Sequence, residues 1–181
     1  MKIPTRVFAS ILVVVAVVGG CSKDDDPDVE QPPSPTGAPA SSADARGAAE
    51  RDAVAAYRGM WDAFVAAGKT ADPDAAALRT YASDDALKLI VTALLQHRQN
   101  QQVILGELVI DPKPTEVRPA DAPTEVMILD CVNDEDWLVY KASGGLADDE
   151  PGGKHQTTAV VTRSGGAWKV KSFELGRSGT C

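Results

Sequence analysis

Three cysteines are the residues of this 181-residue chain with the most distinctive chemistry: Cys21, Cys131 and Cys181. A thiol can be acylated, oxidised to a disulfide or used as a nucleophile. The chain has no C-x-x-C pair, and no histidine adjoins a cysteine, so the sequence does not indicate redox catalysis. The surroundings of each cysteine must therefore decide its chemistry.

Cys21 follows a short apolar segment near the start of the chain. Two basic residues precede an almost unbroken apolar run over residues 7–18, and two glycines separate this run from Cys21. A membrane-spanning helix needs about 20 apolar residues, so this run is too short for a permanent span. A basic start, a short apolar core and small residues at the end predict a secretory signal peptide over residues 1–20.

The end of this segment resembles the lipobox of bacterial lipoproteins. Val18-Gly19-Gly20-Cys21 has an aliphatic residue, two small residues and a cysteine in the order of that motif. The resemblance implies that the mature chain begins at Cys21, carries a diacylglycerol group on this thiol, and is anchored at the extracytoplasmic face of the cell membrane. An ordinary signal peptide with an incidental cysteine is the alternative.

Cys131 and Cys181 are the two cysteines left once Cys21 is acylated. Two cysteines in an exported, oxidising setting usually pair, so we expect a disulfide between them. The bond would close a loop of about 50 residues and hold the C-terminus in place. Two free thiols are the alternative.

The residues that follow Cys21 have the composition of a tether. Five prolines and an acidic run occur before residue 48, and large apolar side chains are nearly absent. Such a segment cannot bury enough surface to offset its ordering entropy. Residues 21–47 are therefore predicted to be a lipidated cysteine and a disordered linker, and residues 48–181 a single folded domain.

The mature chain is expected to be strongly acidic. The whole sequence has a net charge of −8, and removal of Lys2 and Arg6 with the signal peptide would leave −10. Phosphate backbones and anionic lipid surfaces attract basic proteins. No nucleic-acid partner is therefore predicted, and membrane attachment is expected through the N-terminal lipid rather than through charge.

Helical periodicity dominates the first part of the folded domain. Residues 48–68 repeat apolar side chains at spacings of three and four, which predicts a helix. Asp72 and Pro73 are a typical cap and first residue for a short second helix. Ser83 is a candidate cap for a third helix, whose first turn would carry two acidic residues that suit the helix dipole.

From about residue 102 the apolar period changes to two, which is typical of strands. Six strands are predicted, at residues 103–110, 115–119, 124–132, 137–142, 155–163 and 167–175. The segment Asn133-Asp134-Glu135-Asp136 has turn chemistry and would separate the third strand from the fourth. Three helices followed by about six antiparallel strands predict an α+β fold, with the helices packed on one face of a curved sheet.

This order of elements, with the segments DCVND (residues 130–134) and GGAWKV (residues 165–170), resembles nuclear-transport-factor-two-like domains. These domains, also called SnoaL-like or ketosteroid-isomerase-like, have a cone-shaped, cystatin-like fold. Together with the lipobox and a terminal Gly-Thr-Cys, the chain resembles small secreted lipoproteins of high-GC Gram-positive bacteria. The resemblance implies the fold but little about activity, because this architecture carries enzymes, binding modules and adaptors alike.

The open end of the cone in this fold is often a pocket lined by the first helices and the concave face of the sheet. Four aromatic side chains are the best candidates to reach it: Tyr57, Trp61, Phe64 and Tyr81. The alternative is that they belong to the core, because apolar residues at helical spacing normally do.

Asp130 is the candidate pocket carboxylate. It alternates along its strand with Val126 and Ile128, so it should share their face of the sheet. A carboxylate on an apolar face is costly unless it is paired or protonated, and proton-transfer enzymes of this fold use such a group. The alternative is that Asp130 lies at a strand end and reaches solvent or a basic partner. No set of base, donor and orienting residue can be assembled from the sequence.

Metal ligation and other common catalytic motifs are not predicted. His97 and His155 are the only histidines, and neither has a neighbouring ligand at metal spacing. The acidic segment around residues 133–136 could attract calcium, but its spacing does not fit an EF-hand, and a charged hairpin tip is the better explanation. No phosphate-binding glycine loop or serine-hydrolase motif occurs. No cofactor is therefore expected.

Three functions are compatible with these observations. The leading hypothesis is a non-enzymatic envelope lipoprotein that binds a partner protein. The alternatives are a binder of a small apolar ligand in the cone, and an isomerase- or cyclase-like enzyme with a pocket carboxylate. An open, mostly apolar cavity with a buried polar group would favour the ligand binder, whereas a filled cone with a flat apolar patch elsewhere would favour the protein partner.

Overall fold

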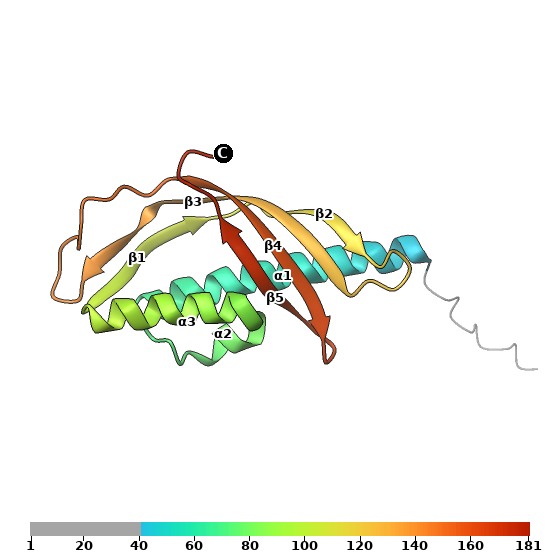
Figure 1. Ribbon diagram of the computed structural model, residues 1–181, viewed down its shortest axis with the longest axis horizontal. Coiled ribbons are helices and arrows are strands. Elements are labelled where there is room, and N and C mark those ends of the chain that lie inside the picture. Colours follow the sequence, from blue (N-terminus) through green and yellow to red (C-terminus); the bar gives the residue numbers. More distant parts are fainter. Residues whose placement is uncertain (1–40) are drawn as a thin grey trace, which may run out of the picture. The chain divides into compact units, whose positions relative to one another are not determined.

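The computed structural model describes residues 41–181 of the chain, so the predicted signal peptide, Cys21 and most of the predicted linker lie outside the described residues. Within this range the elements are α1 (Ser42–Gly68), α2 (Ala76–Tyr81), α3 (Asp84–Gln99), β1 (Gln102–Val109), β2 (Lys113–Arg118), β3 (Glu125–Lys141), β4 (Lys154–Ser164) and β5 (Ala167–Leu175). The strands form one antiparallel sheet that curves over the three helices (Figure 1). The predicted α+β class and the predicted packing of helices on one face are confirmed.

Helix α1 begins earlier than expected. The Ser41 hydroxyl accepts a hydrogen bond from the Asp44 amide at 3.2 Å, and the Asp44 carboxylate accepts one from the Ser41 amide, also at 3.2 Å. This reciprocal capping box satisfies two amides that the helix itself leaves unpaired. The alanine-rich sequence that follows favours continued helix. Residues 42–47, which we expected in the linker, therefore belong to α1.

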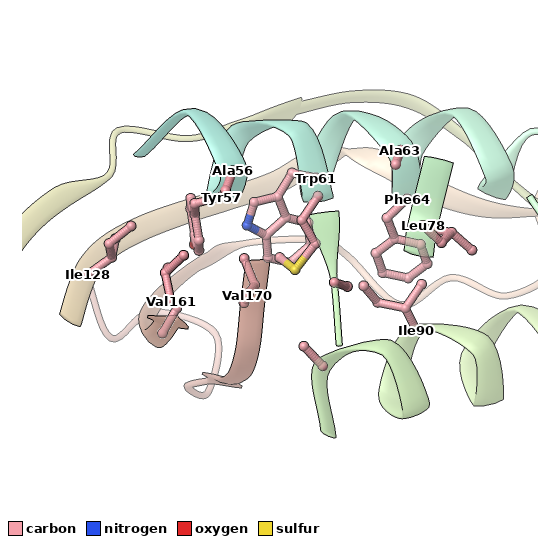
Figure 2. Packing of buried hydrophobic residues seen from close by; sticks show 14 of the residues in the cluster. Ala56, Tyr57, Trp61, Ala63, Phe64, Leu78, Ile90, Ile128, Val161 and Val170 are labelled. Carbon is pink, nitrogen blue, oxygen red and sulfur yellow. The ribbon is translucent and has the colours of Figure 1, made fainter. Parts of the chain in front are cut away.

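One face of α1 forms the centre of the core. Tyr57, Met60, Trp61 and Phe64 are buried on this face. Buried alanines lie between these larger side chains, and their small size lets the helix approach the sheet closely. In Figure 2 the side chains of α1 point towards Val161 and Val170 of the sheet and towards α3.

Strand β3 organises the sheet. It has 17 residues, of which those from Glu125 to Asn133 pair with β4 along one edge, and β5 extends the sheet beyond β4. Along the other edge, β2 pairs with the first part of β3 and β1 with the last part. Because β1 and β2 share a single edge, β3 spans the whole curved sheet and contributes side chains to both of its ends.

The turn predicted at residues 133–136 is wrong, and the six predicted strands are five because β3 continues through this segment. Asn133 pairs with Val109 on one side and with Lys154 on the other. These pairs, together with the hydrogen bond from the Asp134 amide to the Gly153 carbonyl, override the local turn preference. The register with β1 shifts between Glu107 and Val109, where a bulge absorbs the irregularity.

The start predicted for the second helix is also wrong. The Asp72 carboxylate accepts a hydrogen bond from the Asp74 amide at 3.0 Å, so Asp72 and Pro73 form a turn, and α2 begins at Ala76. Ser83 is the N-cap residue of α3, as predicted, although its side chain makes no capping hydrogen bond.

A disulfide bond joins Cys131 of β3 to Cys181, and the two Cα atoms are 5.9 Å apart. This is the pairing expected from the sequence. The same C-terminal segment is held by hydrogen bonds to β4: the Thr180 hydroxyl accepts the Gln156 amide at 2.9 Å, and the Gly179 amide donates to the Lys154 carbonyl at 2.8 Å. The residues after β5 are therefore attached to the sheet both covalently and through the backbone.

Candidate functional site

A cavity of about 600 Å³ lies between α1, α3 and the strands β1, β3 and β5, and we call it the aromatic cavity. Its lining residues are Trp61, Phe64, Leu89, Ile90, Ala93, Leu108, Val132, Asp134, Trp137, Phe173, Glu174 and Leu175. Ten of these twelve are apolar and the other two are acidic, so the cavity has the size and the largely apolar lining of a small-molecule site.

Another hollow, of about 580 Å³, lies where α3 leads into β1. Its walls include the exposed side chains of Arg98, Asn100, Gln101 and Lys141. This lining is polar and comes mainly from turns, so it offers a ligand few fixed apolar contacts. The aromatic cavity, whose walls belong to the core, is the better candidate site.

Edge-to-face contacts hold the aromatic walls of the cavity in place. The ring centroids of Trp61 and Phe173 are 5.3 Å apart at 61°, and those of Phe64 and Trp137 are 5.1 Å apart at 83°. Trp61 also stacks on Phe64 at 6.1 Å. These geometries are favourable for aromatic pairs, and they connect α1 to β3 and to β5. The cavity is thus preformed by the packing of the core.

Asp134 and His155 form a polar contact at the cavity. The Asp134 Oδ1 atom accepts the Gly153 amide at 2.6 Å and lies 3.1 Å from the His155 Nε2 atom. The other ring nitrogen of His155, Nδ1, lies 2.9 Å from the Gly176 carbonyl oxygen. These contacts join β3, β4 and the segment after β5, and so fix the position of the Asp134 carboxylate.

The structure separates the predicted pocket residues into three groups. Trp61 and Phe64 line the aromatic cavity, whereas Tyr57 and Asp130 are buried but do not line it. Tyr81 is 36% exposed, and a Cβ atom added at Gly59 would lie 2.6 Å from its ring, so Tyr81 packs over the surface of α1 instead of reaching the cavity.

Asp130 lies on the buried face of β3, as its alternation with Val126 and Ile128 predicts, and it is 4% exposed. The alternative that it lies at a strand end in solvent is wrong, because β3 continues well beyond it. Its Oδ1 atom accepts the Asp111 amide at 2.7 Å, while its Oδ2 atom has no hydrogen-bond partner among residues 41–181. Asp130 therefore holds the segment that connects β1 to β2.

Tyr57 carries a polar group into the core. No atom of residues 41–181 meets full hydrogen-bond geometry with its hydroxyl, but Asp130 and Trp61 are near enough to influence it. Burial, and then the negative charge of Asp130, raise the pKa of Tyr57 far above its ordinary value, while Trp61 opposes this shift. The hydroxyl is therefore held in its neutral form.

These positions do not assemble a catalytic site in the aromatic cavity. Asp130 is among the residues that line a different hollow, of about 400 Å³, beside the disulfide. A proton-transfer base has to lie within hydrogen-bond reach of its substrate, and Asp130 does not meet this condition for a ligand in the aromatic cavity. Within residues 41–181 no cluster of three or more histidine, cysteine or acidic side chains has the arrangement of a metal site.

Reasoning from the sequence missed half of the aromatic wall. Trp137 and Phe173 face the cavity from β3 and β5, and Leu108 faces it from β1. Their strands were predicted, but the strand register and the bulge between β1 and β3 decide which strand residues face α1. The only signal in the sequence was the large size of Trp137 and Phe173 in strands that alternate.

Comparison of the sequence with protein-family models finds no match, and comparison with curated proteins finds no matching relative. Solved structures do resemble the chain. The intermembrane space region of the chloroplast protein ARC6 is 15% identical, with a TM-score of 0.44, and the match covers 70% of this chain and 98% of that one.

Two further matches are described as having a cystatin-like fold. One, a protein of unknown function from Nostoc punctiforme, is 10% identical, with a TM-score of 0.43 over 70% of this chain and 92% of that one. The other, from Caulobacter vibrioides, is 13% identical, with a TM-score of 0.42 over 68% of this chain and 88% of that one. No activity is transferred to this chain at such identities.

Proposed function

We propose that this protein is a lipid-anchored, extracytoplasmic binding protein whose domain holds a small, largely apolar ligand in the aromatic cavity. The observation that carries this proposal is the cavity itself, which has a volume of about 600 Å³ and walls that the core packing holds in place. A cone filled by side chains would have favoured a partner protein, whereas an open one favours the small ligand.

Anchoring is supported by the sequence ahead of the described residues and by the disulfide. The lipobox-like segment ends at Cys21, and a proline-rich, acidic stretch separates it from α1. The pairing of Cys131 with Cys181 suits an oxidising compartment outside the cytoplasm. None of the helices within residues 41–181 has the length and apolarity needed to cross a membrane.

Binding rather than catalysis is proposed because the carboxylate and the hydroxyl expected to transfer protons, those of Asp130 and Tyr57, lie outside the cavity lining. The Asp134 carboxylate does line the cavity, but its Oδ1 atom is engaged by the Gly153 amide and His155. The isomerase-like alternative therefore lacks the base on which it rested.

A fluorescence titration tests the binding function. The mature chain carrying Cys21→Ser, and so lacking the lipid, would be titrated with the neutral apolar dye N-phenyl-1-naphthylamine. Ala93 lines the cavity, so Ala93→Phe should fill it and weaken binding about tenfold or more. Thr92→Phe introduces the same ring at the next, exposed position of α3 and should leave binding unchanged.

Equal affinities of the two phenylalanine variants would place the dye elsewhere on the molecule. A failure of the Cys21→Ser chain to bind the dye saturably would remove the proposed function. Circular dichroism of both variants checks that a loss of binding does not come from a loss of fold.

A further inference from the structure

The aromatic cavity combines π-electron faces with negative charge. Four aromatic side chains line it, and they come from three different elements: Trp61, Phe64, Trp137 and Phe173. The face of an aromatic ring attracts a cation whose centre lies within about 6 Å, and tryptophan does so most strongly. Aromatic walls of this kind bind quaternary ammonium groups in other proteins, because such groups are weakly hydrated and fit among rings.

The ionisable side chain that faces the cavity is acidic. Asp134 lies on the cavity side of β3, whereas Glu174 points to the outer face of β5 because Phe173 and Leu175 point inward, and no lysine or arginine lines the cavity. His155 contacts Asp134, so the formal charge of this pair is 0 when the imidazole is protonated and −1 when it is neutral. The site therefore carries no net positive charge in either form of His155.

The positions of these groups suggest how a ligand would lie. Trp61 and Phe64 are almost fully buried and form the inner wall, whereas Leu89 and Leu175 are 50% and 45% exposed at the outer part of the lining. Asp134 and Trp137 both belong to β3, so a charged group beside Asp134 would also lie near an aromatic ring. An anionic head would face the Asp134 carboxylate without a lysine or arginine in the lining, which disfavours fatty acids and similar anions.

We propose that the ligand of the aromatic cavity is an organic cation, with an apolar body and a tertiary or quaternary ammonium head. The body contacts the buried aromatic wall, and the head lies beside Trp137 and the carboxylate of Asp134. This inference rests on the proposed binding function and names the chemical class of its ligand. The acidic surface of the chain, which has a net charge of −8, would also favour the approach of a cation.

Three probes that share one decyl chain test this inference: decyltrimethylammonium, decanol and decyl sulfate, each below its micelle concentration. The full mature chain carrying Cys21→Ser would be titrated with each probe by calorimetry. We expect decyltrimethylammonium to bind about tenfold more tightly than decanol, because only the cation uses the aromatic faces and the Asp134 carboxylate. Decyl sulfate should bind more weakly than decanol.

Two variants assign the preference to the proposed groups. Trp137→Leu keeps an apolar side chain but removes the π face, and it should lower the affinity for the cation about tenfold while changing that for decanol less than about twofold. Asp134→Asn should lower only the affinity for the cation. Trp168→Leu is the matched control, because Trp168 does not line the cavity. If Trp137→Leu fails to fold, Phe173→Leu replaces it.

The outcomes separate this inference from the function on which it rests. Equal affinities for decanol and decyltrimethylammonium, or a preference for decyl sulfate, would overturn the organic-cation inference and leave apolar ligand binding intact. Absence of binding for all three probes would contradict both. A preference for the cation that persists unchanged in Trp137→Leu, Phe173→Leu and Asp134→Asn would place the ammonium group outside this cavity and so overturn the assignment.

Discussion

Tyr57 is a core residue whose ionisation should make the stability of the fold depend on pH. Its ring is completely buried on α1, and its hydroxyl has no partner with full hydrogen-bond geometry among residues 41–181. A buried hydroxyl without a good partner lowers stability by about 1–3 kcal/mol, and an ionised one would cost more. The fold therefore depends on Tyr57 remaining neutral.

The raised pKa of Tyr57 predicts a loss of stability in alkali. Above its ordinary pKa of 10.0, the unfolded chain loses the tyrosine proton while the folded chain keeps it. The contribution of the neutral Tyr57 to the free energy of unfolding is thus complete below pH 10. It is lost as the pH rises further, by about 1.4 kcal/mol per pH unit. Urea unfolding between pH 8 and 11 measures this slope.

Tyr57→Phe should lack the pH-dependent contribution of the tyrosine hydroxyl, so its free energy of unfolding should fall less steeply with pH than that of the wild type. Tyr81→Phe is the control, since this ring lies at the surface. If the wild-type and Tyr57→Phe curves run parallel through pH 11, then Tyr57 ionises equally in both states and the account of its surroundings is incorrect.

At the scale of elements, β3 decides the form of the sheet. Its middle carries an acidic sequence that would form a turn in isolation, yet it remains extended because β1 pairs along one edge, while on the other edge Asn133 pairs with β4 and the Asp134 amide donates to the Gly153 carbonyl. The step from Glu107 to Val109 in β1 faces the longer step from Asn133 to Asp136 in β3, so the bulge lies within this sequence. As a consequence Asp134 and Trp137, an odd number of positions apart, both line the aromatic cavity.

Gly106 is the residue of β1 that this close pairing requires. Its φ angle is 108°, and a Cβ atom there would overlap the backbone oxygen of Asp136. Gly144 has a similar φ of 105°, but a Cβ atom there would meet nothing within 4 Å. Gly144→Ala should therefore cost only the backbone strain, about 1–2 kcal/mol. Gly106→Ala should cost about 1–3 kcal/mol more, because the strands must move apart.

Urea unfolding of the two alanine variants measures this difference directly. Equal losses of stability would mean that β1 and β3 are not in close contact at Gly106. The comparison is informative because both positions share the left-handed backbone and differ only in what surrounds them.

The disulfide holds the segment that follows β5 against the sheet. It links Cys131 to Cys181 across 50 positions of sequence, and loop closure of this length stabilises the folded chain by about 4 kcal/mol. The double variant Cys131→Ala/Cys181→Ala should lose about this amount in urea unfolding. Adding a reductant should destabilise the wild type similarly and leave the variant unaffected. A wild type whose unfolding midpoint is insensitive to complete reduction would contradict this expectation.

At the scale of the whole molecule, the central prediction concerns the lipid at Cys21. The lipobox-like segment predicts that the mature chain starts with a diacylglycerol-modified cysteine, and two acyl chains give stable membrane attachment. The wild type should be recovered with the membrane fraction and carry the additional mass on Cys21. Cys21→Ser should appear in the soluble fraction.

Cys181→Ala is the control for this fractionation, because it removes a thiol without touching the lipobox-like segment. It should remain with the membranes. An unmodified Cys21 in membrane-associated wild-type protein would show that a different feature holds the protein there.

Much of the architecture was predictable because it rests on local patterns. The helical spacing of Tyr57, Trp61 and Phe64 predicted their burial, and the period of two predicted the strands. The pairing of Cys131 with Cys181 followed from their number and from the expected compartment. Side chains at fixed spacing along one element share a face whatever the rest of the chain does.

Only the tertiary structure decided the aromatic cavity. Its aromatic walls come from α1 and from Trp137 and Phe173, which lie more than 70 positions later, and their meeting depends on strand register and on one bulge. Tyr81 points to the surface and Trp137 to the cavity for the same reason: long-range packing sets where the face of an element is directed. Local sequence determines which residues share one face of a helix or strand. The strand register along β3 determines which of these faces come into contact.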